Sequence, residues 1–201
     1  MSEFLTFMQF GVRHIADVGA MDHILFLLAL AAIYRVSDWR DVIRVVTAFT
    51  VGHSITLVAA VLGFLPLSGR IVEFLIPLTI VATCVENIVV RDRSTAPLRG
   101  HYRPVFATVF GLVHGAGFGG YLKSLFVDRI AVPLFGFNVG IEIGQLGVLA
   151  LAFTAIAIVD LAIRQSSAAY LRIAPLRLRV VALSTVVMIV AARWAVERSP
   201  W

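Results

Sequence analysis

Charged side chains are scarce in this chain. Only 14% of its 201 residues are charged, whereas soluble domains carry roughly 25%. Hydrophobic residues make up 60%, and the mean hydropathy is +0.94. This composition predicts an all-α membrane protein that crosses the bilayer several times. The length suits one helical bundle over residues 1–201 and leaves no room for a soluble catalytic domain.

Motifs with local chemistry are also absent. The single cysteine, Cys84, excludes an internal disulfide and disfavours a thiolate site for copper(I). Neither H-E-x-x-H nor C-x-x-C occurs, so any metal site must be assembled from distant residues. No P-loop is present, and nothing else suggests ATP hydrolysis. The net charge of +5 does not indicate a nucleic-acid partner, because basic residues of membrane proteins gather in cytoplasmic loops.

Apolar stretches predict six membrane spans after a short amphipathic segment. Residues 2–13 mix phenylalanines with polar residues and are too short to span, which predicts an interfacial helix. The fifth span exceeds the ~20 residues that a crossing needs, so we expect it to tilt, kink or start in the interface. The expected spans cover residues 18–34, 45–64, 72–90, 104–122, 133–163 and 180–196.

Basic residues lie mainly on one side of this topology. Eleven arginines fall in the loops at 35–44, 91–103 and 164–179, and six basic residues lie on the opposite side. The positive-inside rule therefore predicts that both termini are outside, in the periplasm of a Gram-negative source. We expect a multi-pass protein of the bacterial inner membrane, with the lipid bilayer as its surroundings.

The fifth predicted span has two different faces. On an ideal helix Asn138, Glu142 and Gln145 share one narrow arc. Glycines at every fourth position form a ridge on the opposite arc, which lets another backbone approach closely. The ridge could hold helices four and five together or bind a second copy of the chain. It consists of Gly136, Gly140 and Gly144, continued by Gly147.

Ionisable and amide side chains recur inside the other spans, where such residues are costly and suggest function. Imidazole and carboxylate groups together suit nickel, zinc, cobalt or iron(II) better than calcium or sodium. We therefore expect a divalent transition metal, nickel or zinc first, in one polar cavity. The expected ligands are His14, Asp22, His23, His53, His114 and Glu142, supported by Ser54, Glu73, Glu86, Asn87, Asn138 and Gln145.

Structural roles compete with this hypothesis. A single buried histidine can simply hydrogen-bond a carbonyl of the next helix, and Asn138 and Gln145 serve equally well as interhelical hydrogen-bonding groups. Glu86 lies near the cytoplasmic end of its span and could instead pair with Arg91. His101 falls in a basic loop and is expected to be solvated. Four inward-facing histidines accompanied by acids nevertheless favour a functional site.

Five ordered motifs in residues 11–147 resemble the HupE/UreJ family of small bacterial membrane proteins. The resemblance implies a metal permease, chiefly for nickel, serving hydrogenase and urease maturation. It also implies that the histidine and aspartate of the first span, here His14, Asp22 and His23, are important for metal. The motifs are AMDHILFLLAL (20–30), TAFTVGHSITL (47–57), Val72-Glu73 with Glu86-Asn87, FGLVHGAGF (110–118) and FNVGIEIGQ (137–145).

One spacing departs from that family pattern. Seven residues, 15–21, separate His14 from the Asp22-His23 pair where the family has five. Two extra residues rotate a continuous helix by about 200°, which would turn His14 away from the family position. Asp17 is the nearby residue that could replace it.

These observations predict a metal permease in which ions pass His14, Asp22 and His23, with Glu73 adding negative charge, and then reach His53, His114 and Glu142. An intramembrane zinc hydrolase is the first alternative, with Ser54 beside His53 as a supporting group. A non-catalytic membrane assembly partner is the second, and it predicts that the polar groups pair with one another.

Overall fold

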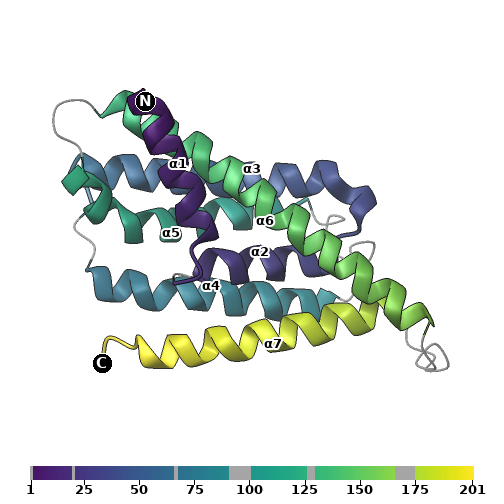
Figure 1. Ribbon diagram of the computed structural model, residues 1–201. Coiled ribbons are helices and arrows are strands. Elements are labelled where there is room, and N and C mark those ends of the chain that lie inside the picture. Colours follow the sequence, from purple (N-terminus) through teal and green to yellow (C-terminus); the bar gives the residue numbers. More distant parts are fainter. Residues whose placement is uncertain (1, 20, 66–67, 91–100, 126–129, 166–174) are drawn as a thin grey trace.

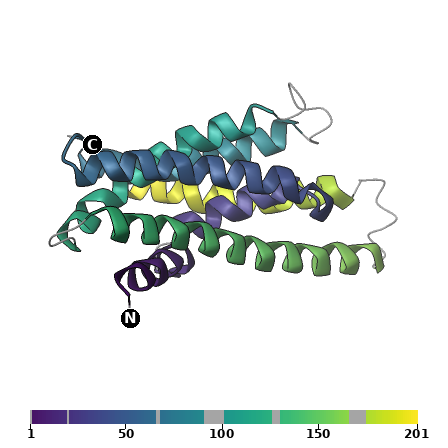
Figure 2. The same ribbon diagram turned by 90° about the horizontal axis from the view of Figure 1, so that it is seen from above.

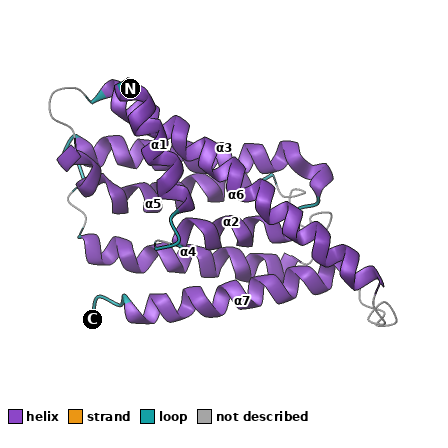
Figure 3. Cartoon of the chain, viewed as in Figure 1, coloured by secondary structure: helices purple, strands orange, loops and turns teal. Residues whose placement is uncertain are grey.

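The computed structural model describes residues 2–19, 21–65, 68–90, 101–125, 130–165 and 175–201. Every regular element among them is a helix, which confirms the predicted all-α class (Figure 3). In chain order these are α1 (Glu3–Ala16), α2 (Asp22–Ile33), the 3-10 turn η1 (Val36–Asp38), α3 (Trp39–Val61), α4 (Gly69–Val90), α5 (Arg103–Leu125), α6 (Ala131–Gln165) and α7 (Pro175–Glu197).

Four of these helices, α3, α4, α6 and α7, are long and apolar enough to cross a membrane. They support the membrane class, and they fall where the second, third, fifth and sixth predicted spans were expected. α5 matches the fourth predicted span in position and is as long as α3. The predicted count of six spans is not confirmed.

The first predicted span, 18–34, is wrong in extent. α2 contains only 12 residues, about 18 Å of helix, and is shorter than the hydrocarbon core. The chain leaves α1 at Asp17, whose side chain accepts a hydrogen bond from the Gly19 amide at 2.8 Å. Nine residues of α2 are buried, so it is a short helix at the centre of the bundle.

α1 is a helix, as predicted, but it packs along the first part of α6. A Cβ atom at Gly140 would overlap the Met8 carbonyl oxygen, and one at Gly11 would overlap that of Phe137. The buried residues of α1 thus have a partner within the chain, and an interfacial position is not needed to explain its amphipathic pattern. The glycine ridge is covered by α1 (Figures 1 and 2).

A second glycine contact joins α3 to α5. Cβ atoms at Gly111 and Gly115 would overlap the carbonyl oxygens of Phe49 and His53, and one at Gly52 would overlap that of Thr108. We predicted that glycines bring the fourth and fifth spans together. That was wrong, because Gly111 and Gly115 of α5 face α3, while Gly136 and Gly140 of α6 face α1.

Both termini lie at one end of the bundle (Figure 1). The ends of α2, α4 and α6 and the starts of α3, α5 and α7 lie at the other end. This alternation agrees with the predicted arrangement of the loops, of which residues 91–100 and 166–174 lie outside the described part of the chain.

Candidate metal site

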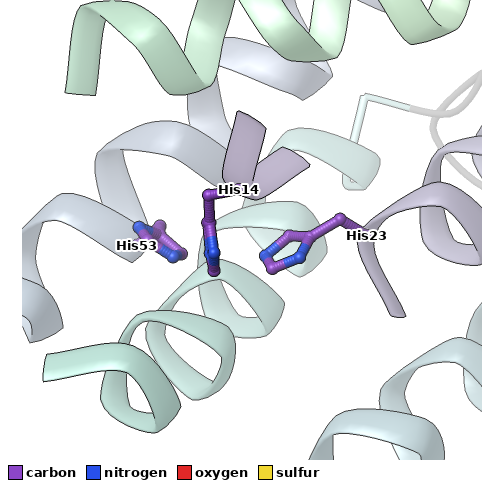
Figure 4. Close-up of side chains that lie close together, drawn as sticks. All are labelled: His14, His23 and His53. Carbon is purple, nitrogen blue, oxygen red and sulfur yellow. The ribbon is translucent and has the colours of Figure 1, made fainter. Parts of the chain in front are cut away.

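Three histidines from three helices converge inside the bundle. His14 comes from the last turn of α1, His23 from the first turn of α2, and His53 from the middle of α3 (Figure 4). One ring nitrogen from each lies within 4.8 Å of the others. Two nitrogens bound to one zinc-like ion can be at most about 4.2 Å apart, so this group is close to the spacing of a metal site.

Five of the six nitrogens of these rings are buried and have no hydrogen-bond partner in the described structure. Both nitrogens of His23, both of His53 and Nε2 of His14 are buried and unpaired. His53 is completely buried, and His23 is 8% exposed. A buried polar atom without a partner costs about 1–3 kcal/mol. Five such atoms on three neighbouring rings are difficult to explain structurally, and they fit residues that bind an ion.

Aromatic rings surround the three histidines. The His14 ring lies 4.0 Å from Phe118, measured between ring centroids, and Phe118 stacks on Phe137 at 5.3 Å. Phe49 lies 6.5 Å from His23 and 6.1 Å from His53. This apolar surround lowers the local dielectric and disfavours charged imidazolium rings. Neutral imidazole is the form that binds a metal ion.

His114 is next to this group but not part of it. Its ring centroid lies 5.4 Å from that of His23. Its Nε2 contacts the Thr79 hydroxyl at 3.1 Å, whereas Nδ1 is buried and unpaired. His114 therefore has one buried nitrogen without a hydrogen-bond partner beside the histidine group.

An open pocket of about 860 Å³ leads to His14. Its lining includes Arg13, Asp17 and Phe118. His14 is only half-buried and connects this pocket with the buried His23 and His53. Of the three histidines, His14 is the one that lines this open pocket.

Two predicted acidic ligands lie elsewhere. Both carboxylate oxygens of Asp22 accept hydrogen bonds from Arg198 Nη1, each at 3.1 Å. Glu142 accepts a hydrogen bond from the Thr47 hydroxyl at 2.7 Å. Neither belongs to the group of ligand atoms formed by the three histidines. Asp17 is not in that group either, and its side chain accepts a hydrogen bond from the Gly19 amide in the turn after α1.

The predicted amides of α6 pair with α3. Ser54 donates a hydrogen bond to Asn138 at 2.8 Å, and Thr50 donates one to Gln145 at 2.8 Å. Together with the Thr47–Glu142 bond they form a polar seam between α3 and α6. The alternative that these residues are interhelical hydrogen-bonding groups agrees with this geometry.

Glu86 and Asn87 belong to a separate network near the other end of the bundle. Glu86 accepts hydrogen bonds from Arg103 and from the Tyr102 hydroxyl. Arg91, the partner considered above, lies outside the described residues. Burial, with the bond to Glu86, raises the pKa of Tyr102 to about 12 and keeps it a neutral donor. Asn87 donates to the Ala29 carbonyl oxygen at 2.7 Å.

Glu73 is not among the ligand atoms that group with the three histidines. It lies on the exposed side of α4, whereas its neighbour Val72 is buried. The negative charge that it was expected to add stays a prediction.

A comparison with protein families gives one match. The family model described as "HupE / UreJ protein" matches residues 1–198 of the chain. The chain belongs to the HupE / UreJ family. No curated protein and no solved structure matches the chain.

Membership of the HupE / UreJ family makes the chain a membrane protein related to metal transport. The match extends the resemblance, which rested on residues 11–147, through α7 to Arg198. In this HupE / UreJ chain the departure in spacing has a simple explanation. The helix is interrupted between His14 and Asp22, so the rotation of a continuous helix does not apply.

Sequence reasoning missed several residues around the site of this HupE / UreJ protein. Phe118 and Phe137 lie in quoted motifs, but aromatic residues in an apolar span give no signal that distinguishes lining from ordinary packing. Arg198 lies 176 residues from Asp22, and no spacing rule connects them. Only the folded arrangement shows that they meet.

Proposed function

We propose that the chain is a permease for a divalent transition metal, with nickel as its first substrate, and that His14, His23 and His53 form its central binding site. The proposal rests chiefly on the three histidines that bring one ring nitrogen each within 4.8 Å of the others, and on the five buried nitrogens of these rings that lack a hydrogen-bond partner. An intramembrane histidine without a partner is costly, and a cation that binds there offsets that cost.

The ligand chemistry favours a borderline metal ion. Neutral imidazole suits nickel, zinc, copper and iron, whereas calcium and magnesium prefer oxygen ligands. The described carboxylates near the site are already hydrogen-bonded or paired, so a three-nitrogen set with one open side remains. Such a site holds an ion less firmly than a closed four-ligand site, which suits an ion that must leave again.

The surrounding features suggest a route. An ion would enter by the open pocket at His14, bind the three histidines and move toward His114. Beyond Phe26, which contacts His114, a cavity of about 60 Å³ lies among α2, α3, α4 and α5. Glu86 and Arg103 line that cavity, and an ion leaving by it would have to pass their ion pair.

The two alternatives have less support. A zinc hydrolase needs a general acid or base beside the metal, and Ser54 instead donates hydrogen bonds to Thr50 and Asn138. An assembly partner would pair its polar groups with one another, as the α3–α6 seam does. The histidines are not paired in this way. Transport therefore explains more of the polar interior.

Nickel uptake and nickel binding test the proposal. The purified chain in liposomes is expected to take up Ni²⁺, and the His53→Ala variant is expected to lose binding by more than about 100-fold, because outer-shell changes alone cost 10–100-fold. His101→Ala is the matched control, since His101 is exposed and distant from the site. Binding and uptake at the wild-type level by a folded His53→Ala variant would contradict the proposal.

A further inference from the structure

α2 carries His23 but has little that fixes it locally. It contains only 12 residues, and Met21 at its N-cap makes no side-chain hydrogen bond to the helix. Isolated helices shorter than about 12–15 residues are marginal, so tertiary contacts must hold α2 in place. Because His23 lies in the first turn, a shift of this helix end moves its ring relative to His14 and His53.

Arg179 of α7 and Arg198, the residue directly after α7, hold the two ends of α2. At the start, Arg198 binds both carboxylate oxygens of Asp22 and lies 5.1 Å above the ring of Trp194. At the end, Arg179 donates hydrogen bonds to the carbonyl oxygens of Ala32 at 3.2 Å and Tyr34 at 2.8 Å. An acid at the N-terminus and a cation at the C-terminus both stabilise a helix dipole.

We propose that Asp22 is a positioning residue rather than a metal ligand, and that it acts through Arg198 to fix the first turn of α2 and the ring of His23. This inference rests on the proposed metal-binding function. Consecutive residues of a helix point about 100° apart, so Asp22 and His23 face different directions. Asp22 faces α7, and both of its oxygens are used there, while His23 faces the other histidines.

The last helix therefore contributes to the metal site without providing a ligand. Arg198 is 31% exposed at its side chain and Asp22 is 15% exposed. Ion pairs that are partly buried are screened less by salt than surface pairs. A movement of the C-terminal end of α7 would therefore shift the first turn of α2, and with it the ring of His23.

Titration with Co²⁺ tests this inference, because its visible absorption reports both affinity and coordination. Arg198→Gln and Asp22→Asn are each expected to weaken binding by about 10-fold, the lower end for outer-shell residues. The double variant is expected to bind no more weakly than either single variant, because both changes break the same contact. At saturating Co²⁺ all three should show the wild-type spectrum, since the ligands are unchanged.

Arg193→Gln is the matched control. It removes another arginine of α7 that pairs with Glu197 at the exposed surface, where the side chains are 78% and 49% exposed. Such pairs contribute little to stability, so Co²⁺ binding should not change. His53→Ala serves as the reference for a lost ligand.

A changed spectrum at saturation in Asp22→Asn, with normal binding by Arg198→Gln, would overturn the inference and make Asp22 a ligand. If Arg198→Gln does not fold, the charge swap D22R/R198D replaces it. Recovered Co²⁺ binding in the swap supports positioning, because a ligand cannot be moved to residue 198, and a folded swap that binds no Co²⁺ overturns it. A wild-type chain without metal binding would instead overturn the proposed function itself, and the inference with it.

Discussion

His53 and Glu142 come from neighbouring helices, yet their surroundings are opposite. Both ring nitrogens of His53 are buried without a partner. Glu142 is half-buried and already accepts a hydrogen bond from Thr47. Both residues were candidate ligands because imidazole and carboxylate side chains bind transition metals. Their contacts assign the free binding capacity to the histidine and an interhelical role to the acid.

The Glu142→Gln substitution separates these two roles. A glutamine keeps the acceptor oxygen for Thr47 and removes the charge, so we expect Ni²⁺ affinity to remain at the wild-type level. The interhelical bond contributes about 0.6 kcal/mol, so stability should also change little. Titration of the purified variant with Ni²⁺, beside His53→Ala, measures this. A loss similar to that of His53→Ala would show that Glu142 reaches the ion.

Residue types could be predicted better than residue partners. Four histidines inside apolar stretches were identified from the sequence, and three of them meet in one group. Their meeting could not be derived by helical phase, because the chain breaks at Asp17 and His14 approaches from a different helix than His23. The partner of Asp22 was equally hidden, since Arg198 is near the other terminus.

At the scale of whole helices, glycine decides which pairs come close. The regular glycines of α6 and α5 were visible in the sequence, and close packing was predicted correctly. Their partners were not, because a glycine ridge accepts any helix of suitable shape. α1 covers the ridge of α6 and carries His14 to the site. A homo-oligomer through this ridge would require α1 to leave it.

A valine at Gly140 is expected to separate α1 from α6. Its Cβ would overlap the Met8 carbonyl oxygen and approach the Cα atom of Gly11, so the backbones must move apart. Overpacking of this kind costs about 1–3 kcal/mol or more. Because His14 is at the end of α1, Ni²⁺ affinity should fall together with protease resistance of the N-terminal segment.

Gly147→Val is the control for this prediction. Gly147 follows Gly144 by three residues and continues the same glycine face, but no atom lies within 4 Å of a Cβ atom there. Binding and protease resistance should match those of the wild type. If Gly140→Val also behaves like the wild type, the packing of α1 on α6 is not needed to hold His14.

At the scale of the molecule, composition predicted a helical membrane protein. The order of apolar and basic segments predicted that the chain runs back and forth between two ends. Low charge and high hydropathy indicated a helical membrane protein, and four helices are long and apolar enough to cross. Composition could not distinguish the buried α2 from a span, since both environments are apolar. Neighbouring helices bury α2, and a hydropathy pattern does not show whether helices or lipid surround a segment.

The orientation of the bundle follows from its basic residues. Eleven arginines belong to the segments at 35–44, 91–103 and 164–179, and the ends of α2, α4 and α6 lie opposite the termini (Figure 1). We therefore expect the termini outside and the arginine-rich end in the cytoplasm of a bacterial cell. In that orientation the start of α4 faces outward, and the exposed turn at η1 faces the cytoplasm.

Cysteine labelling in intact cells measures this orientation. Ser68 and Ser37 are exposed serines at opposite ends of the bundle, and the one native cysteine, Cys84, is buried and gives little background. A membrane-impermeant maleimide should label the Ser68→Cys variant in intact cells. It should label Ser37→Cys only after the membrane is opened, because the reagent cannot cross the bilayer. The reverse pattern would mean that the open pocket at His14 faces the cytoplasm, and the chain would then load metal from inside the cell.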